Sequence, residues 1–273
     1  MMNLKQRIKN ARFASDFDST VTQQNAFVLL TKLLLKHHSK KWDVHKIVRQ
    51  APKILYYRSK FIAINRFDKY LNKPHGNDED IYKSKVRLLK GVPYSIFEEE
   101  IVPMLRINPM FIRKFLQFRE LFKFKKEDIL LVSKNGIDEI NSFLDYSSEN
   151  NINRYLLPKE EFRDKNVSNR EILTHLGINF IPVCNKLGKQ EMVSGNKKYL
   201  AYNGRMTKNF DYFIDKKSKI RLYKDRIVFG DNEDAIYGSI PLAFINVQIN
   251  SKNEKKLRNY LQKNKLINKQ DNS

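Results

Sequence analysis

Two aspartates, Asp16 and Asp18, stand two positions apart near the start of the chain, within the stretch 12–22. This stretch predicts a short strand that carries both carboxylates to a turn, followed by a helix from about Gln23. Carboxylates two apart on a strand project to the same side, because successive side chains alternate between faces. Two acids with no basic residue beside them repel each other unless a cation or a shared proton compensates. The pair therefore indicates a divalent metal site.

Further polar residues follow apolar runs elsewhere in the chain. The turn at 133–136 lies between an apolar run and a helical pattern, where free backbone N–H groups and the helix dipole favour an anion. Ser133 in this turn is equally well explained as a helix cap. Thr207 is suited to cap a short helix that begins at Lys208. The run at 226–229 leads into an acidic turn that contains Asp231 and Asp234.

Apolar runs alternate with helical patterns along most of the chain. The region 23–124 predicts several helices, broken near its prolines and glycines, and another helix is predicted at 168–176. The runs that predict buried strands lie at 12–16, 129–132, 180–184, 226–229 and 240–247, and turn residues between 185 and 206 predict a β-hairpin. This order implies an α/β fold, a Rossmann-like parallel sheet with flanking helices on both faces. Such sheets place functional residues beyond the carboxyl ends of their strands, where all the polar clusters fall. A surface helix is predicted near the end, at 254–266.

The composition favours an intracellular protein. A single cysteine, Cys184, excludes an intramolecular disulfide and suits a reducing compartment. The N-terminus lacks the apolar core of a signal peptide. No run reaches the roughly 18 apolar residues of a membrane-spanning helix. We therefore expect a cytoplasmic protein without a transmembrane segment.

The chain is strongly basic, with 52 Lys and Arg against 30 Asp and Glu and a formal net charge of +22. This charge favours a polyanionic partner such as nucleic acid or an anionic membrane surface. The basic residues are, however, spread along a chain rich in Lys, Asn and Ile, as an A/T-rich coding sequence would also produce. Composition leaves both explanations open.

Four short motifs occur in order along the chain. They are Asp-Phe-Asp-Ser-Thr at 16–20, Val-Ser at 132–133, Lys208, and Gly-Asp at 230–231. Together they resemble the motifs of the haloacid dehalogenase (HAD) superfamily of phosphohydrolases, and within it the branch similar to phosphoserine phosphatase. The resemblance spans most of the chain. It implies a HAD-like core at 1–22 and 125–273, with a helical cap domain inserted at 23–124.

The resemblance also implies a chemistry. Asp16 would be the nucleophile that takes the phosphoryl group as an aspartyl phosphate, and Asp18 would protonate the leaving alcohol and then activate water. The implied Mg²⁺ ligands are Asp16, Asp18 through its backbone carbonyl, Asp231 and Asp234, and the implied phosphate-binding residues are Ser133, Asn135, Gly136 and Lys208. The implied activity is Mg²⁺-dependent hydrolysis of a phosphate monoester, most simply of a phosphorylated small molecule.

Two features depart from the motifs of that family. The second acid of the last motif falls at Ala235, so Asp234 or Glu233 must substitute for it. The segment 150–166 is longer than the family needs at that place. The alternative is therefore a catalytically degenerate HAD-like protein that binds nucleic acid or an acidic membrane through its basic surface.

The lysine of the third motif has neighbours that compete with it. Three further lysines lie close to Lys208 in the sequence: Lys216, Lys217 and Lys219. We prefer Lys208, because it opens a predicted helix and would place an ammonium near a strand end.

Overall fold

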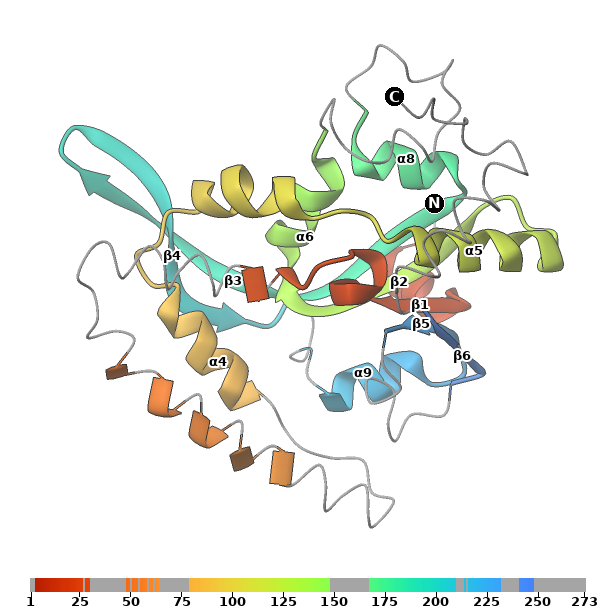
Figure 1. Cartoon of the computed structure of the whole chain (residues 1–273), viewed down its shortest axis with the longest axis horizontal. Helices are drawn as coiled ribbons and strands as arrows, with labels where there is room; N and C mark the ends of the chain where they lie inside the picture. The colour runs from red at the N-terminus through yellow and green to blue at the C-terminus, as the bar shows by residue number, and fades with distance from the viewer. Residues whose placement is uncertain are drawn as a thin grey trace, which may run out of the picture.

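A six-stranded sheet lies at the centre of the computed structural model (Figure 1). The structure describes residues 3–26, 28–29, 48–49, 51–53, 55–57, 59–60, 62–63, 79–147, 167–209, 214, 216–231 and 241–247, and every structural statement below concerns these residues. The strands are β1 (Phe13–Asp16), β2 (Glu127–Gly136), β3 (Ile178–Ser194), β4 (Lys197–Thr207), β5 (Ile227–Gly230) and β6 (Ala243–Asn246).

The strand order is β4-β3-β2-β1-β5-β6, and all neighbours pair in parallel except β3 with β4. This confirms the predicted parallel sheet with a hairpin after its third strand. Figure 1 shows the hairpin extending well beyond the rest of the sheet. The order also places β1, the first strand of the chain, between β2 and β5, so that later segments flank it on both sides.

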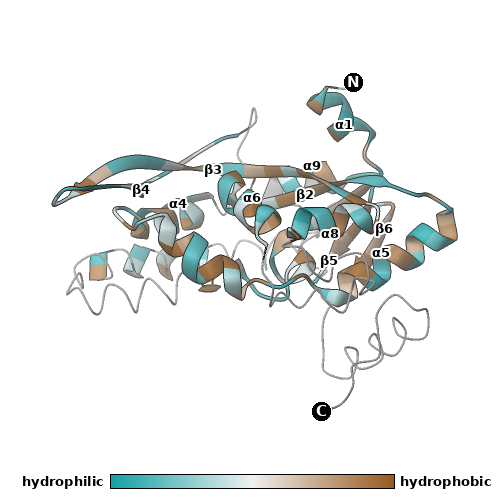
Figure 2. Ribbon diagram, turned by 90° about the horizontal axis from the view of Figure 1, so that it is seen from above, coloured by the Kyte–Doolittle hydropathy of each residue, from teal (hydrophilic) through white to brown (hydrophobic). Residues whose placement is uncertain are grey.

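Helices cover both faces of the sheet, as the alternating pattern predicted (Figure 2). On one face lie α5 (Pro109–Phe122), α6 (Ile137–Asp145) and α8 (Asn169–His175), and on the other lie α1 (Leu4–Asn10) and α9 (Lys216–Tyr223). The region between β1 and β2 also holds α4 (Glu79–Leu88) and the short helical turns η2 (Phe97–Ile101) and η3 (Val102–Met104). Among the described residues, no helix is long and apolar enough to cross a membrane.

Local signals account for where several helices begin. Ser168 and Glu171 form a reciprocal capping box at the start of α8, in the region where a helix was predicted. Asn108 accepts hydrogen bonds from two backbone N–H groups at the start of α5, and Pro109 follows as the first helical residue. Each cap satisfies N–H groups that have no partner inside the helix.

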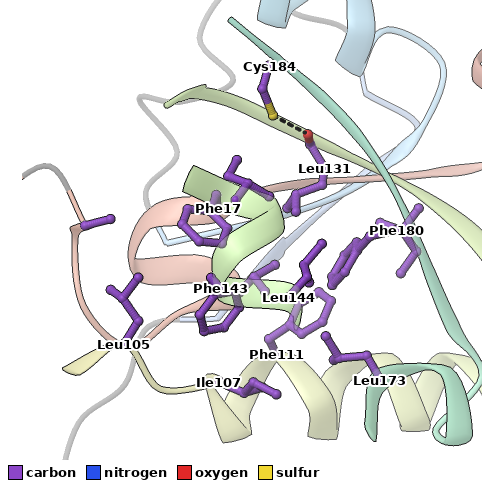
Figure 3. Close-up of a cluster of buried hydrophobic side chains, with 14 of the residues drawn as sticks. Phe17, Leu105, Ile107, Phe111, Leu131, Phe143, Leu144, Leu173, Phe180 and Cys184 are labelled. Atoms are coloured by element: carbon purple, nitrogen blue, oxygen red, sulfur yellow. Dashed lines mark hydrogen bonds between the residues drawn. The ribbon is translucent and has the colours of Figure 1, made fainter. Parts of the chain in front are cut away.

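The two faces of the sheet bury different side chains because neighbouring residues on a strand alternate. Phe13, Leu131 and Phe229 belong to the larger core, beneath α5, α6 and α8, and Ala14 and Val132 to the smaller core beneath α9. Aromatic rings dominate the larger core. Figure 3 shows Phe111 of α5 beside Phe180 of β3, with ring centroids 5.8 Å apart. Such burial is the main stabilising term of the fold.

Helix α5 packs on the sheet although it lies inside the stretch 23–124 that was assigned to a cap. Its Phe111 and Phe115 are fully buried, and both contact Phe229 of β5. The last helix before β2 is therefore part of the layer that covers the core. The division into core and cap stays a prediction.

One further sequence prediction is wrong, and two others lie outside the described residues. Thr207 is the last residue of β4, and no helix begins at Lys208. The next described helix is α9, which begins at Lys216. The unusual segment 150–166 and the predicted helix at 254–266 lie outside the described residues.

Helix α1 is tied to the sheet by an ion pair that makes stability depend on pH. Arg7 donates to both carboxylate oxygens of Asp128, at 2.9 and 3.0 Å. The hydrogen bonds from Arg7 lower the pKa of Asp128, so the pair stabilises the fold above about pH 4 and is lost as the pH falls through the lowered pKa. We expect Asp128→Asn to cost about 0.5–1 kcal/mol in the free energy of unfolding at pH 7, and almost nothing near pH 2.5.

Urea titrations at the two pH values measure this difference. Asp145→Asn is the control, because Asp145 pairs with Arg170 on the surface and its side chain is 60% exposed. An effect of Asp128→Asn that is equally large at both pH values would contradict the assignment.

Candidate active site

The candidate site lies at the carboxyl edge of the three central strands. Asp16 is the last residue of β1 and pairs in register with Val132 of β2, so Ser133 comes next to it on that strand. On the other side Ser15 pairs with Phe229 of β5, so Gly230 and Asp231 follow at the same edge. Parallel pairing thus brings three of the predicted motifs to one edge of the sheet.

Asp16 forms an ion pair with Lys219 of α9. The Lys219 ammonium lies 2.7 Å from Asp16 Oδ1, and the two side chains are only 9% and 16% exposed. The backbone N–H of Phe17 donates to the same oxygen, at 2.9 Å. Burial alone would lower the pKa of Lys219, but the nearby Asp16 carboxylate outweighs it, and the net shift is upward. Lys219 is therefore protonated at neutral pH, and Oδ1 of Asp16 accepts from two donors.

The lysine beside Asp16 differs from the one that sequence analysis preferred. Lys208 follows β4 directly and its side chain is exposed. Lys219 lies in the fourth position of α9, where its side chain turns toward the sheet together with Tyr223 one turn later. The preference for Lys208 depended on a helix start that the structure does not contain. The structure therefore places Lys219 against Asp16, at the position that was expected for Lys208.

Asp18 lies in the turn that follows β1, the irregular element η1 (Phe17–Val21), and its carboxylate is held by N–H donors. The backbone N–H of Ala26 donates to Oδ1 at 2.9 Å, and the Asn135 side-chain amide lies 3.2 and 3.1 Å from the two oxygens. Burial, and then the charge of Asp16, raise the pKa of Asp18 to about 7. A carboxyl group with such a pKa can give and take a proton near neutral pH.

Residues 133–136, which were predicted to form a turn, are the last four residues of β2, and α6 begins directly after them. The pairing with β3 changes register between Ser133 and Gly136, so this end of the strand is irregular. Asn135 donates its backbone N–H to Ser133 Oγ, at 3.1 Å, so the hydroxyl partly serves to shape this strand end. At Gly136 a Cβ atom would overlap the side chain of Glu139, which lies in the first turn of α6. A larger residue at 136 would therefore force the side chains of Glu139 and Leu187 to move, although the backbone φ of −70° is open to other residues.

Two side chains near the site were not predicted from the sequence. The Tyr82 hydroxyl of α4 donates to Asn135 Oδ1 at 2.9 Å. Tyr223 of α9 is fully buried, and its hydroxyl finds no hydrogen-bond partner within the described part of the chain. Neither residue lies near a recognisable motif in the sequence, so only the tertiary contacts reveal them.

The acidic residues at this edge suit a hard divalent cation. Asp231 follows β5 and is half-buried, and its charge contributes to the raised pKa of Tyr223, which is caused first by burial. The described residues contain no group of three His, Cys, Asp or Glu side chains that could hold a metal ion. Mg²⁺, however, is commonly bound through one or two carboxylates and several waters, so Asp16 and Asp231 are a chemically adequate pair. Asp234 and Ala235 lie outside the described residues.

Comparison with known proteins yields similarity in structure only. No family model and no curated protein sequence matches the chain. A phospho-aspartyl intermediate analogue of phosphoserine phosphatase is similar at 13% identity and a TM-score of 0.42, covering 86% of this chain and 87% of that one. A substrate-bound phosphoserine phosphatase complex is similar at 12% identity and a TM-score of 0.44, covering 92% and 97%. Phosphoserine phosphatase in apo form is similar at 13% identity and a TM-score of 0.37, covering 83% and 80%. All three TM-scores lie below 0.5, so this similarity by itself says nothing about the chemistry of the site.

The Asp16–Lys219 ion pair makes a testable contribution to stability. Removing one partner leaves the other charge poorly solvated, so Lys219→Met and Asp16→Asn should each lower the free energy of unfolding by about 3 kcal/mol. The double variant should lose much less than the sum, because neither charge then remains. Urea unfolding of the four proteins at pH 7 measures the coupling.

Lys208→Met is the matched control, and its effect should stay within about 0.5 kcal/mol. Strictly additive effects of the two single substitutions would mean that Asp16 and Lys219 do not interact in solution.

Proposed function

We propose that the chain is a phosphatase that hydrolyses a phosphate monoester through an aspartyl phosphate on Asp16. The observation that carries this proposal is the arrangement of Asp16, Lys219 and Asp18. A nucleophilic carboxylate, a buried ammonium and a carboxyl group able to exchange protons meet at the carboxyl edge of a parallel sheet. Phosphoryl transfer depends mainly on alignment and charge neutralisation, which these groups supply.

Asp16 attacks through Oδ2. Lys219 and the Phe17 N–H both occupy Oδ1, and no described residue donates a hydrogen bond to Oδ2. A bond forms between this oxygen and phosphorus, and the bond from phosphorus to the substrate oxygen breaks. Lys219 holds the carboxylate in a fixed orientation and offsets negative charge on the phosphoryl oxygens.

Asp18 moves the protons in both half-reactions. It gives its proton to the departing substrate oxygen, which leaves as an alcohol. It then takes a proton from the water that attacks phosphorus, which frees inorganic phosphate and restores Asp16. A pKa of about 7 suits both steps, because neither protonation state is strongly disfavoured near neutral pH.

The segment 133–136 is proposed to bind the phosphoryl oxygens. Ser133 follows Val132, the register partner of Asp16, and would contribute its hydroxyl together with the backbone N–H groups of Asn135 and Gly136, before the N-terminus of α6. The Asn135 N–H donates to Ser133 Oγ in this structure and would have to exchange that partner for a phosphoryl oxygen. In the sequence-derived scheme Mg²⁺ would be held by Asp16, Asp18, Asp231 and Asp234, and would neutralise charge on the transferred group. The stretch 23–124 would supply a cap that selects a phosphorylated small molecule.

An activity assay tests the proposal. Purified protein with Mg²⁺ should hydrolyse p-nitrophenyl phosphate, and Asp16→Asn should lose at least about 1,000-fold in kcat, as expected for loss of a nucleophile. Lys219→Met should lose about 100-fold or more, since it removes a group that offsets transition-state charge. Circular dichroism checks that each variant is folded.

Lys208→Met decides between the two lysine assignments. We expect it to retain nearly full activity, whereas a loss as large as that of Lys219→Met would restore the assignment made from the sequence. Wild-type protein without turnover on aryl phosphates and phosphorylated metabolites, or full activity in Asp16→Asn, would refute the proposed function.

A further inference from the structure

A chain of hydrogen bonds connects helix α4 with Asp18. The Tyr82 hydroxyl donates to Asn135 Oδ1, at 2.9 Å, and the Asn135 side-chain N–H₂ group lies 3.1 and 3.2 Å from the two oxygens of Asp18. These three residues come from three separate parts of the chain. Asn135 is 7% exposed, so its amide depends on protein partners for its hydrogen bonds.

The Asn135 side-chain amide is held by hydrogen bonds at both its oxygen and its nitrogen. The terminal torsion of an asparagine side chain has broad minima, so the amide plane is not set by rotamer preference alone. A hydrogen bond from Tyr82 to the oxygen end fixes the plane, and the nitrogen end then faces the Asp18 carboxylate. Without the hydroxyl, a buried carbonyl oxygen lacks its donor and the amide is free to turn away from Asp18.

Tyr82 is itself firmly positioned by the packing of α4. Val86, one turn after Tyr82 in the helix, and Leu89, directly after the helix ends, are buried in the larger core, and Tyr82 packs against that core. The chain that follows α4 forms an isolated antiparallel bridge with β4, at Pro93 and Ala201. Gly91 N–H donates to Tyr202 O at 2.8 Å, and Tyr202 N–H donates to Val92 O at 3.0 Å. The hydroxyl is thus carried by an element fixed to the hairpin rather than by a loop.

We propose that Tyr82 is a positioning residue, which fixes the Asn135 amide and through it the orientation of the Asp18 carboxyl group. The role in turnover rests on the proposed function. Ala26, whose N–H also holds Asp18, and Tyr82 both belong to the stretch between β1 and β2. This inserted stretch therefore sets the direction of the proton-transferring group, in addition to any contact with substrate.

Kinetics of Tyr82→Phe test the role in turnover. A displacement of about 1 Å at a reacting group costs roughly 100-fold, so a partial loss of orientation should lower kcat by about 10-fold. KM should change by less than about twofold, because the proposed role acts through Asn135 and Asp18 and not through substrate binding. In an Asn135→Ala background, Tyr82→Phe should have no further effect on kcat.

Tyr94→Phe is the matched control. Tyr94 lies in the same inserted stretch, and its hydroxyl shares a 2.8 Å hydrogen bond with Ser142, whose other partner is Glu98 and which makes no hydrogen bond to Asp16, Asp18 or Asn135. We expect its kcat to stay within about twofold of wild type. An unchanged kcat in Tyr82→Phe, a rise in KM in place of a fall in kcat, or an equal loss in the Asn135→Ala background would each overturn the proposed role.

A second measurement separates this inference from the proposed function. In protein labelled with ¹⁵N-asparagine, the side-chain amide signals of Asn135 are identified by their loss in Asn135→Ala. Tyr82→Phe should shift and broaden these signals, and Tyr94→Phe should leave them in place. Unchanged signals in Tyr82→Phe would overturn the positioning role. If wild type shows no phosphatase turnover, the proposed function and the kinetic role fail, and the amide spectra alone decide whether Tyr82 holds Asn135.

Discussion

The ion pair between Asp16 and Lys219 is the interaction around which the candidate site is built. It joins the last residue of the first strand to a helix more than two hundred residues later, at a separation of 2.7 Å. Two charges so little exposed are tolerable only because each satisfies the other. The ammonium and a backbone N–H both donate to one carboxylate oxygen, so the second oxygen accepts no hydrogen bond from the described residues.

The sheet order explains why these distant segments meet. β1 is central, β2 and β5 flank it in parallel, and all three strands end at the same edge. Phe13 of β1 and Phe229 of β5 fill the core on one face, and α9 covers the other face with Lys219 and Tyr223. The site is therefore a consequence of packing: the layers that bury the apolar side chains also fix where the polar ones emerge.

Asp18 shows how the surroundings set the chemistry of one side chain. Burial and the neighbouring Asp16 charge oppose its ionisation, whereas the N–H groups of Ala26 and Asn135 favour it. The result is a carboxyl group whose two protonation states are close in free energy near neutral pH. Because Tyr82 anchors Asn135 from α4, this balance depends on a helix that lies outside the sheet.

The sequence by itself determined the features that depend on neighbouring residues. The apolar runs predicted the strands, a helix was predicted at 168–176, and the order of Asp16, Ser133 and Asp231 predicted a common edge. These features follow from local hydrogen bonding, side-chain alternation and the rule that parallel strands end together.

Only the tertiary structure decided which partners those residues meet. The sequence alone does not show whether Lys208 or Lys219 lies next to Asp16. The rotation of α9 against the sheet brings Lys219 to that position. Likewise, Phe111 and Phe115 fit a helix in any domain, and contact with Phe229 places α5 on the core. Tyr82 meets Asn135 through the docking of α4, 53 residues away in the chain. The physical reason is that local patterns fix which face of an element is apolar, whereas its position and rotation come from long-range packing.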